Sequence, residues 1–125
     1  MEHFPEPLRV EAAHFDGESR WWKLTHYYRY ISSVGVITVP TGTKTDLASI
    51  PKAFRSIFDT AGPWLGAAII HDFLYSKSSD LHFRMSRKKC DEIFLEAMFN
   101  SGIGWERNVI YAAVRVGGWK SFKKK

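Results

Sequence analysis

The sequence predicts an α+β domain, in which a small N-terminal antiparallel sheet or hairpin is followed by three to four packed helices. Strand-forming residues dominate the first third of the chain, and apolar residues at helical spacing dominate the remainder. The length of 125 residues is that of one ordinary domain, and a hydrophobic fraction of 45% is enough for a core. We therefore expect one domain, with residues 1–45 mainly strands, 46–118 mainly helices and 119–125 a basic tail.

The N-terminal third is predicted to form strands. A first short strand is expected over Leu8–Ala12. The segment that follows is rich in Trp, Tyr, Ile, Val and Thr, which suit a half-buried pleated surface. Ser32-Ser33 or Gly35 marks a turn within it. The pattern therefore predicts a hairpin of roughly Trp21–Ile31 against Val34–Val39.

Helical spacing begins after residue 46. Pro51 suits a first helical turn, and the apolar residues after it predict a helix over about 51–58. Gly62-Pro63 opens a second helix that runs to about Ser76. This second helix is apolar nearly all round, so it belongs in the interior of the domain.

The C-terminal part is predicted to form two further helices. Ser86 is a candidate N-cap for a helix that runs to about Asn100, where Gly102 and Gly104 end it. A fourth helix is expected over Trp105–Val116, before a pair of glycines.

Composition and charge exclude several classes of protein. The single cysteine, Cys90, rules out an internal disulfide framework. The acidic N-terminus shows no signal peptide, and the longest apolar run, around Ala67–Ile70, is too short to span a bilayer. The net charge of +5 is concentrated in Arg84–Lys89 and Lys120–Lys125. These segments can meet phosphate, or they can simply keep a helix start and a terminus soluble.

A polar cluster interrupts the two apolar helices that are predicted around residues 62–76 and 86–100. His71-Asp72 lies within the first, and Tyr75 projects from the same face as His71, four residues later. In the second, Asp91 shares the core-facing stripe with Phe94 and two further apolar residues. Two antiparallel helices would therefore bring Asp91 opposite His71 and Tyr75.

Two interpretations of this cluster remain open. A carboxylate that binds one imidazole nitrogen fixes the tautomer and leaves the other nitrogen as a base, with water as the nucleophile. His71, Asp91 and Tyr75 are the catalytic candidates under this interpretation. Alternatively, buried His–Asp–Tyr networks exist only to satisfy one another and to specify a core.

The strings AAIIHDFLY, at Ala67–Tyr75, and CDEIF, at Cys90–Phe94, resemble the H-D-x-x-Y … D motif of secreted and parvoviral phospholipases A2. This resemblance implies that His71 activates water for attack on a glycerophospholipid ester. It further implies that Asp72 binds calcium, and that Asp91, held by Tyr75, orients the histidine.

The same region, together with TDLASIP at Thr45–Pro51, is similar to a bacteriophage and prophage family of unknown function that combines T-D-L-A-S-[IV]-P with H-D-x-L-Y. The similarity covers roughly Pro40–Gly102. It implies a phage-encoded protein that acts in the virion or in the host cytoplasm.

A metal site is a further hypothesis. The stretch upstream of His71 lacks the glycine-rich calcium loop of the phospholipases, so another oxygen donor is required. Asp46, in the turn before the helices, could join Asp72 in holding Ca²⁺ or another divalent metal. Asp46 could equally be a turn or capping residue. An HD-type metal phosphohydrolase would need further histidine ligands that are not suitably placed.

We therefore expect a phage-type hydrolase, resembling phospholipase A2, whose partners are phospholipid or an anionic membrane surface. The alternative is a non-enzymatic virion component, or a protein that binds a host protein, with a structural His–Asp–Tyr cluster. The aromatic residues around Trp22 and Tyr28 could stack on bases. Aromatics on a sheet are more often core or cross-strand pairs, however, so a nucleic-acid partner is not expected.

Overall fold

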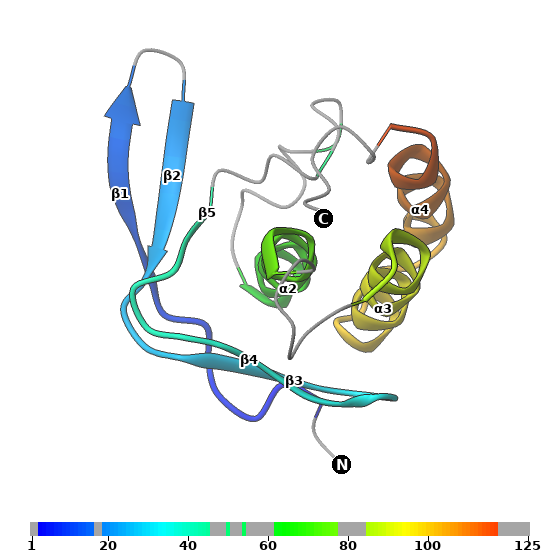
Figure 1. Cartoon of the computed structure of the whole chain (residues 1–125), viewed down its shortest axis with the longest axis horizontal. Coiled ribbons are helices and arrows are strands. Elements are labelled where there is room, and N and C mark those ends of the chain that lie inside the picture. Colours follow the sequence, from blue (N-terminus) through cyan, green and yellow to red (C-terminus); the bar gives the residue numbers. More distant parts are fainter. Residues whose placement is uncertain are drawn as a thin grey trace.

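A computed structural model describes residues 3–16, 19–45, 50, 54, 62–77 and 85–117 of the chain. The described part contains a small antiparallel β region followed by helices, which confirms the predicted α+β class. In Figure 1, helix α2 lies centrally, between the strands on one side and the neighbouring helices α3 and α4 on the other.

The strands form two separate sheets. β1 (Val10–Asp16) pairs antiparallel with β2 (Ser19–Leu24), and the short β5 (Lys44–Thr45) pairs with the other edge of β2. β3 (Tyr28–Ser32) and β4 (Gly35–Val39) form a hairpin of their own, with Ser32 opposite Gly35. Gly35 has φ +123°, a conformation that favours glycine after this tight turn.

The prediction of one strand over Trp21–Ile31 is wrong. The chain leaves the first sheet after Leu24 and enters the second at Tyr28, so the predicted strand is two strands in different sheets. The bend allows Leu24 and Tyr28, both buried, to pack into one core from two sheets. The first strand also lies later than predicted, because β1 begins at Val10 and continues to Asp16.

The helices lie close to their predicted positions. They are α2 (Gly62–Lys77), α3 (Arg87–Asn100) and α4 (Glu106–Gly117). Ser86 caps α3 by accepting a hydrogen bond from the backbone N–H of Lys89, at 3.1 Å. Of the helix predicted over 51–58, only Phe54 is described. Its backbone is helical, and the rest of that prediction lies outside the described residues.

The C-terminal end of α3 turns sharply into α4. Gly102 has φ +93°, and the N–H groups of Gly102 and Ile103 donate to the carbonyls of Phe99 and Met98. This pattern is a Schellman motif, which satisfies the last carbonyls of the helix. The turn sends α4 back along α3, and the two helices pack side by side.

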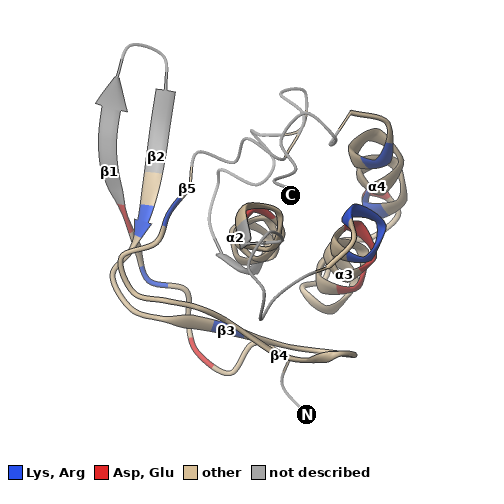
Figure 2. Cartoon of the chain, in the orientation of Figure 1, with Lys and Arg blue, Asp and Glu red and all other residues tan. Residues whose placement is uncertain are grey.

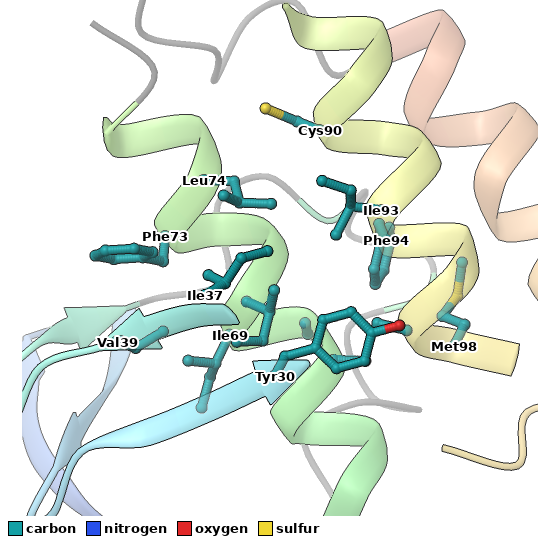
Figure 3. Packing of buried hydrophobic residues seen from close by; sticks show 14 of the residues in the cluster. Tyr30, Ile37, Val39, Ile69, Phe73, Leu74, Cys90, Ile93, Phe94 and Met98 are labelled. Carbon is teal, nitrogen blue, oxygen red and sulfur yellow. The ribbon is translucent and has the colours of Figure 1, made fainter. Parts of the chain in front are cut away.

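The core surrounds α2, which is covered by the β3–β4 hairpin, by β5 and by α3 (Figures 1 and 3). Figure 3 shows apolar side chains from β3, β4, α2 and α3 meeting here, among them Ile37, Ile69, Leu74 and Phe94. The hairpin approaches α2 closely at Gly66, where an added Cβ would lie 2.2 Å from the hydroxyl oxygen of Tyr28.

A candidate His–Asp site between α2 and α3

Three of the predicted site residues meet where α2 and α3 pack against each other. The helices run antiparallel, since Leu74 lies near Cys90 while Ile69 lies toward the Met98 end (Figure 3). His71 Nε2 and Asp91 Oδ1 are hydrogen-bonded at 2.8 Å. The Tyr75 hydroxyl donates to the same oxygen at 2.5 Å. A single carboxylate oxygen therefore bridges two side chains that lie one helical turn apart on α2.

The cluster is wholly enclosed by the protein. The side chains of His71 and Asp91 are both 0% exposed, and Tyr75 is buried beside them. The imidazole stacks on the ring of Phe94, with 4.3 Å between the ring centroids, and it also contacts the ring of Tyr75. Aromatic packing and the bond to Asp91 thus fix the orientation of the imidazole.

Two arginines neutralise the second oxygen of Asp91. Arg115 Nη1, from α4, donates to Asp91 Oδ2 at 2.8 Å, and Arg87 Nη1 lies 3.6 Å from the same oxygen. Arg87 also donates to the backbone carbonyls of Val114 and Arg115, at 3.3 and 3.1 Å. The N-terminal turn of α3 therefore holds the C-terminal turn of α4 beside the carboxylate.

The electrostatics favour an ionised aspartate and a neutral histidine. Burial alone would raise the pKa of Asp91, but hydrogen bonds from His71, Tyr75 and Arg115 outweigh burial and lower this pKa. Burial lowers the pKa of His71, and this effect exceeds the opposing influence of Asp91. A neutral imidazole bound to an ionised carboxylate carries its proton on the nitrogen that faces the carboxylate, here Nε2. The pair has the protonation states of a general base and its orienting anion.

Asp72 and His71 are adjacent in the sequence but bind different partners. The Thr45 hydroxyl donates to Asp72 Oδ2, so β5 is tied to α2 next to the histidine. Thr45 is buried, whereas Asp72 is half-buried. Since Thr45 begins TDLASIP and Asp72 belongs to HDFLY, the two motifs of the sequence meet here. Ile50, near the end of TDLASIP, is also buried in the core.

The metal hypothesis involves two carboxylates, Asp46 and Asp72. Asp46, one of the two candidate ligands, lies outside the described residues. In the described part of the chain, no group of three or more His, Cys, Asp or Glu side chains is arranged to hold a metal ion. Asp72 is therefore the described carboxylate on which the hypothesis depends.

Sequence reasoning missed Arg87 and Arg115. Arginine on a surface helix normally indicates a solvated face, and Asp91 and Arg115 are 24 residues apart in the chain. The sequence offered no clear signal for Arg115, because the residue after an apolar one in a helix points about 100° away from it. Arg87 precedes Asp91 by one helical turn, which is the spacing of an i,i+4 ion pair.

The fold and the site define a small α+β domain with a buried His–Asp–Tyr cluster braced by arginine. The chain belongs to the family described as "Protein of unknown function (DUF1353)", whose model matches residues 22–114. This match runs from β2 through most of α4 and includes the whole cluster except Arg115.

A relative among curated proteins is "Uncharacterized protein y4jT" from Sinorhizobium fredii (strain NBRC 101917 / NGR234). The two sequences are 36% identical over 83 residues, which cover 64% of this chain and 23% of the relative. The chain thus spans less than a quarter of that protein. No solved structure matches the chain significantly. Among the described residues, no helix is long and apolar enough to cross a membrane.

Proposed function

We propose that this domain is a hydrolase in which His71 is the general base and Asp91 its orienting carboxylate. The observation that carries the proposal is the Asp91 carboxylate, which binds His71 Nε2 at 2.8 Å and also accepts from Tyr75. The resemblance to phospholipase A2 implies this same set of three residues. It suggests the carboxylic ester of a phospholipid as the substrate.

The chemistry follows from the protonation states. Neutral His71 takes a proton from water through Nδ1, the nitrogen that does not face Asp91, as the water oxygen attacks the ester carbonyl. The ester C–O bond then breaks, and the imidazolium returns the proton to the leaving alkoxide. Ionised Asp91 stabilises the transient imidazolium, and Tyr75 and Arg115 keep Asp91 ionised. Turnover requires a conformation in which water and the ester reach the imidazole, which is 0% exposed.

A divalent cation such as Ca²⁺ fits the proposal if Asp46 and Asp72 act together. The bond from Thr45 to Asp72 supports this pairing, because Asp46 follows Thr45 directly in the sequence. Carboxylate oxygens are the ligands that Ca²⁺ prefers. A cation bound there would polarise the ester carbonyl. The phage motif resemblance suggests that the protein acts in the virion or the host cytoplasm.

The test is fatty-acid release from anionic phospholipid vesicles, measured with Ca²⁺ and with a chelator. His71→Gln is the key variant, because its side-chain amide can keep a hydrogen bond to Asp91 while the base is lost. His26→Gln, at a partly exposed imidazole outside the cluster, is the matched control. We expect release from the wild type and from His26→Gln, and none from the folded His71→Gln. No release from folded wild-type protein in either condition would reject the phospholipid substrate.

The second candidate is a non-enzymatic virion component or host-binding protein with a structural cluster. The complete burial of His71 and Asp91 favours it, since buried polar networks can serve only to specify a core. Under this hypothesis His71→Ala leaves Asp91 with one fewer partner and lowers the free energy of unfolding by roughly 2–4 kcal/mol. Folded wild-type protein would then release no fatty acid.

A further inference from the structure

Helix α4 carries apolar side chains on both of its faces. Ile110 and Val114 are buried against α3. On the opposite face, Trp105, just before the helix, is 72% exposed, Val109 is 48% exposed and Val116 is 80% exposed. Ala112, also exposed, completes a spacing of four, three and four residues. This exposed row, Trp105, Val109, Ala112 and Val116, is called the outer stripe below.

A basic rim lies beside the last turn of α4, on the side of α4 that faces α3 and near the Val116 end of the outer stripe. Arg87, Lys88 and Lys89 form the first turn of α3, which contains no acidic residue. The hydrogen bonds from Arg87 to the carbonyls of Val114 and Arg115 place this turn beside the last turn of α4. Lys and Arg accordingly gather on neighbouring ends of α3 and α4 in Figure 2. The basic rim consists of these three residues and Arg115.

Two cations of the basic rim are accessible to an external anion. Arg115 uses Nη1 for Asp91 and is 31% exposed, and Lys88 is exposed, whereas Lys89 lies 4.0 Å from the carboxylate of Glu92. The N-terminal end of a helix dipole is positive, and the side chains in this turn of α3 are positive as well. Both would attract an external anion. The sequence also places Lys120 and the final Lys123–Lys125 shortly after Gly117, the last residue of α4.

We propose that the outer stripe and the basic rim together dock on an anionic phospholipid bilayer. An interfacial helix buries Trp and aliphatic side chains at the boundary between headgroups and acyl chains, while Lys and Arg meet the lipid phosphates. The outer stripe supplies Trp105, Val109 and Val116 for the first role. The basic rim supplies the charge complementarity for the second.

A second copy of the chain fits this surface less well. The middle of the outer stripe contains only Val109 and Ala112, both modest in size, while its largest side chain, Trp105, lies at one end. A stable protein interface typically buries roughly 800 Å² per partner, and a single row of four side chains on one helix is narrow for that purpose. A bilayer needs only a few inserted side chains and nearby cations.

This docking surface deepens the proposed function but does not require it, because binding can be measured without turnover. The experiment is sedimentation of the full chain with vesicles of phosphatidylglycerol and phosphatidylcholine, against vesicles of phosphatidylcholine alone. The test variant is the triple W105Q/V109Q/V116Q. Tyr27→Gln, which removes an aromatic side chain that is 41% exposed elsewhere on the surface, is the control.

We expect binding to the anionic vesicles that weakens at high salt and falls by roughly tenfold or more in the triple variant. Lys88→Gln should weaken binding by a smaller factor, and Tyr27→Gln should bind like the wild type. His71→Gln should also bind normally, so loss of hydrolysis and loss of docking are distinguishable. The proposal is overturned if the folded chain ignores anionic vesicles or if the triple variant binds unchanged. It is also overturned if light scattering shows a wild-type dimer that the triple variant dissociates.

Discussion

Arg115 and Asp91 join α4 to α3 through an ion pair of 2.8 Å in which the carboxylate is 0% exposed and the guanidinium is 31% exposed. The arginine thus reaches from the edge of the molecule to a charge that has no contact with water. Asp91 depends on it, because an ionised buried carboxylate is costly without charged partners.

Replacement of Arg115 by glutamine should therefore lower the free energy of unfolding, by roughly 1–3 kcal/mol. Arg87, 3.6 Å from the same carboxylate oxygen, limits the loss. Urea titration measures the change, and Arg9→Gln, at an exposed position outside the cluster, provides the control. Equal effects of the two substitutions would show that the ion pair contributes nothing.

Tyr75→Phe tests the hydroxyl that shares Asp91 Oδ1 with His71. Loss of one hydrogen bond to a buried charge should cost roughly 1–3 kcal/mol of stability. Tyr111→Phe is the matched control, since no hydrogen bond of the Tyr111 hydroxyl is found within the described ranges. A loss of stability as large in Tyr111→Phe would indicate a general effect of removing tyrosine hydroxyls.

Gly66→Ala should destabilise the fold by crowding Tyr28. The added Cβ would lie 2.2 Å from the Tyr28 hydroxyl oxygen, and both residues are buried, so the Tyr28 ring, or the β3–β4 hairpin that carries it, would have to shift away from α2. Overpacking of this kind costs roughly 1–3 kcal/mol. Gly117→Ala adds a Cβ with nothing within 4 Å and should be nearly neutral. Thermal unfolding of the two variants, followed by circular dichroism, gives the comparison.

The stability of the domain should fall in acid in two steps. Burial lowers the pKa of folded His71 below 6.5, so as the pH falls through 6.5 the unfolded chain takes up a proton that the folded chain does not. Stability should then decrease by at most about 1.4 kcal/mol per pH unit for this one group. The pKa of folded Asp91 is also lowered, so a second loss should begin near 3.8 and continue as the pH falls through the folded pKa.

Comparison of His71→Gln with the wild type isolates the first step. Urea midpoints measured between pH 5 and 8 should show a shallower dependence on pH in His71→Gln, because the buried imidazole is absent. If the slope survives in His71→Gln, its origin lies in other groups.

Much of the helical part of the fold could be predicted from the sequence because its boundaries are marked by local chemistry. Ser86 offers an N-cap oxygen, Gly102 adopts positive φ at a helix end, and Gly62-Pro63 opens α2 where it was expected. The His71–Asp91 pair could be predicted from the sequence for a similar reason. Helical periodicity placed Asp91 on a core-facing stripe, and the apolar residues all round the helix of His71 placed that helix in the interior.

The strands and the arginines were harder to predict. No glycine or proline marks the bend between Leu24 and Tyr28, and the aromatic residues around it suit a continuous strand. The partner strands of the first sheet depend on pairing that local sequence does not specify. Likewise, only the tertiary packing of α4 on α3 reveals that Arg115 neutralises Asp91.

The position of Arg115 on α4 also sets the order in which the residues of the cluster become available during synthesis. The ribosome releases the two sheets, α2 and α3 first, so His71, Tyr75 and Asp91 emerge before their arginine brace on α4. Until Arg115 has left the exit tunnel, Arg87 is the cation that remains beside Asp91 among the described residues. The carboxylate of Asp91 is therefore fully neutralised only once α4 has emerged and docked on α3.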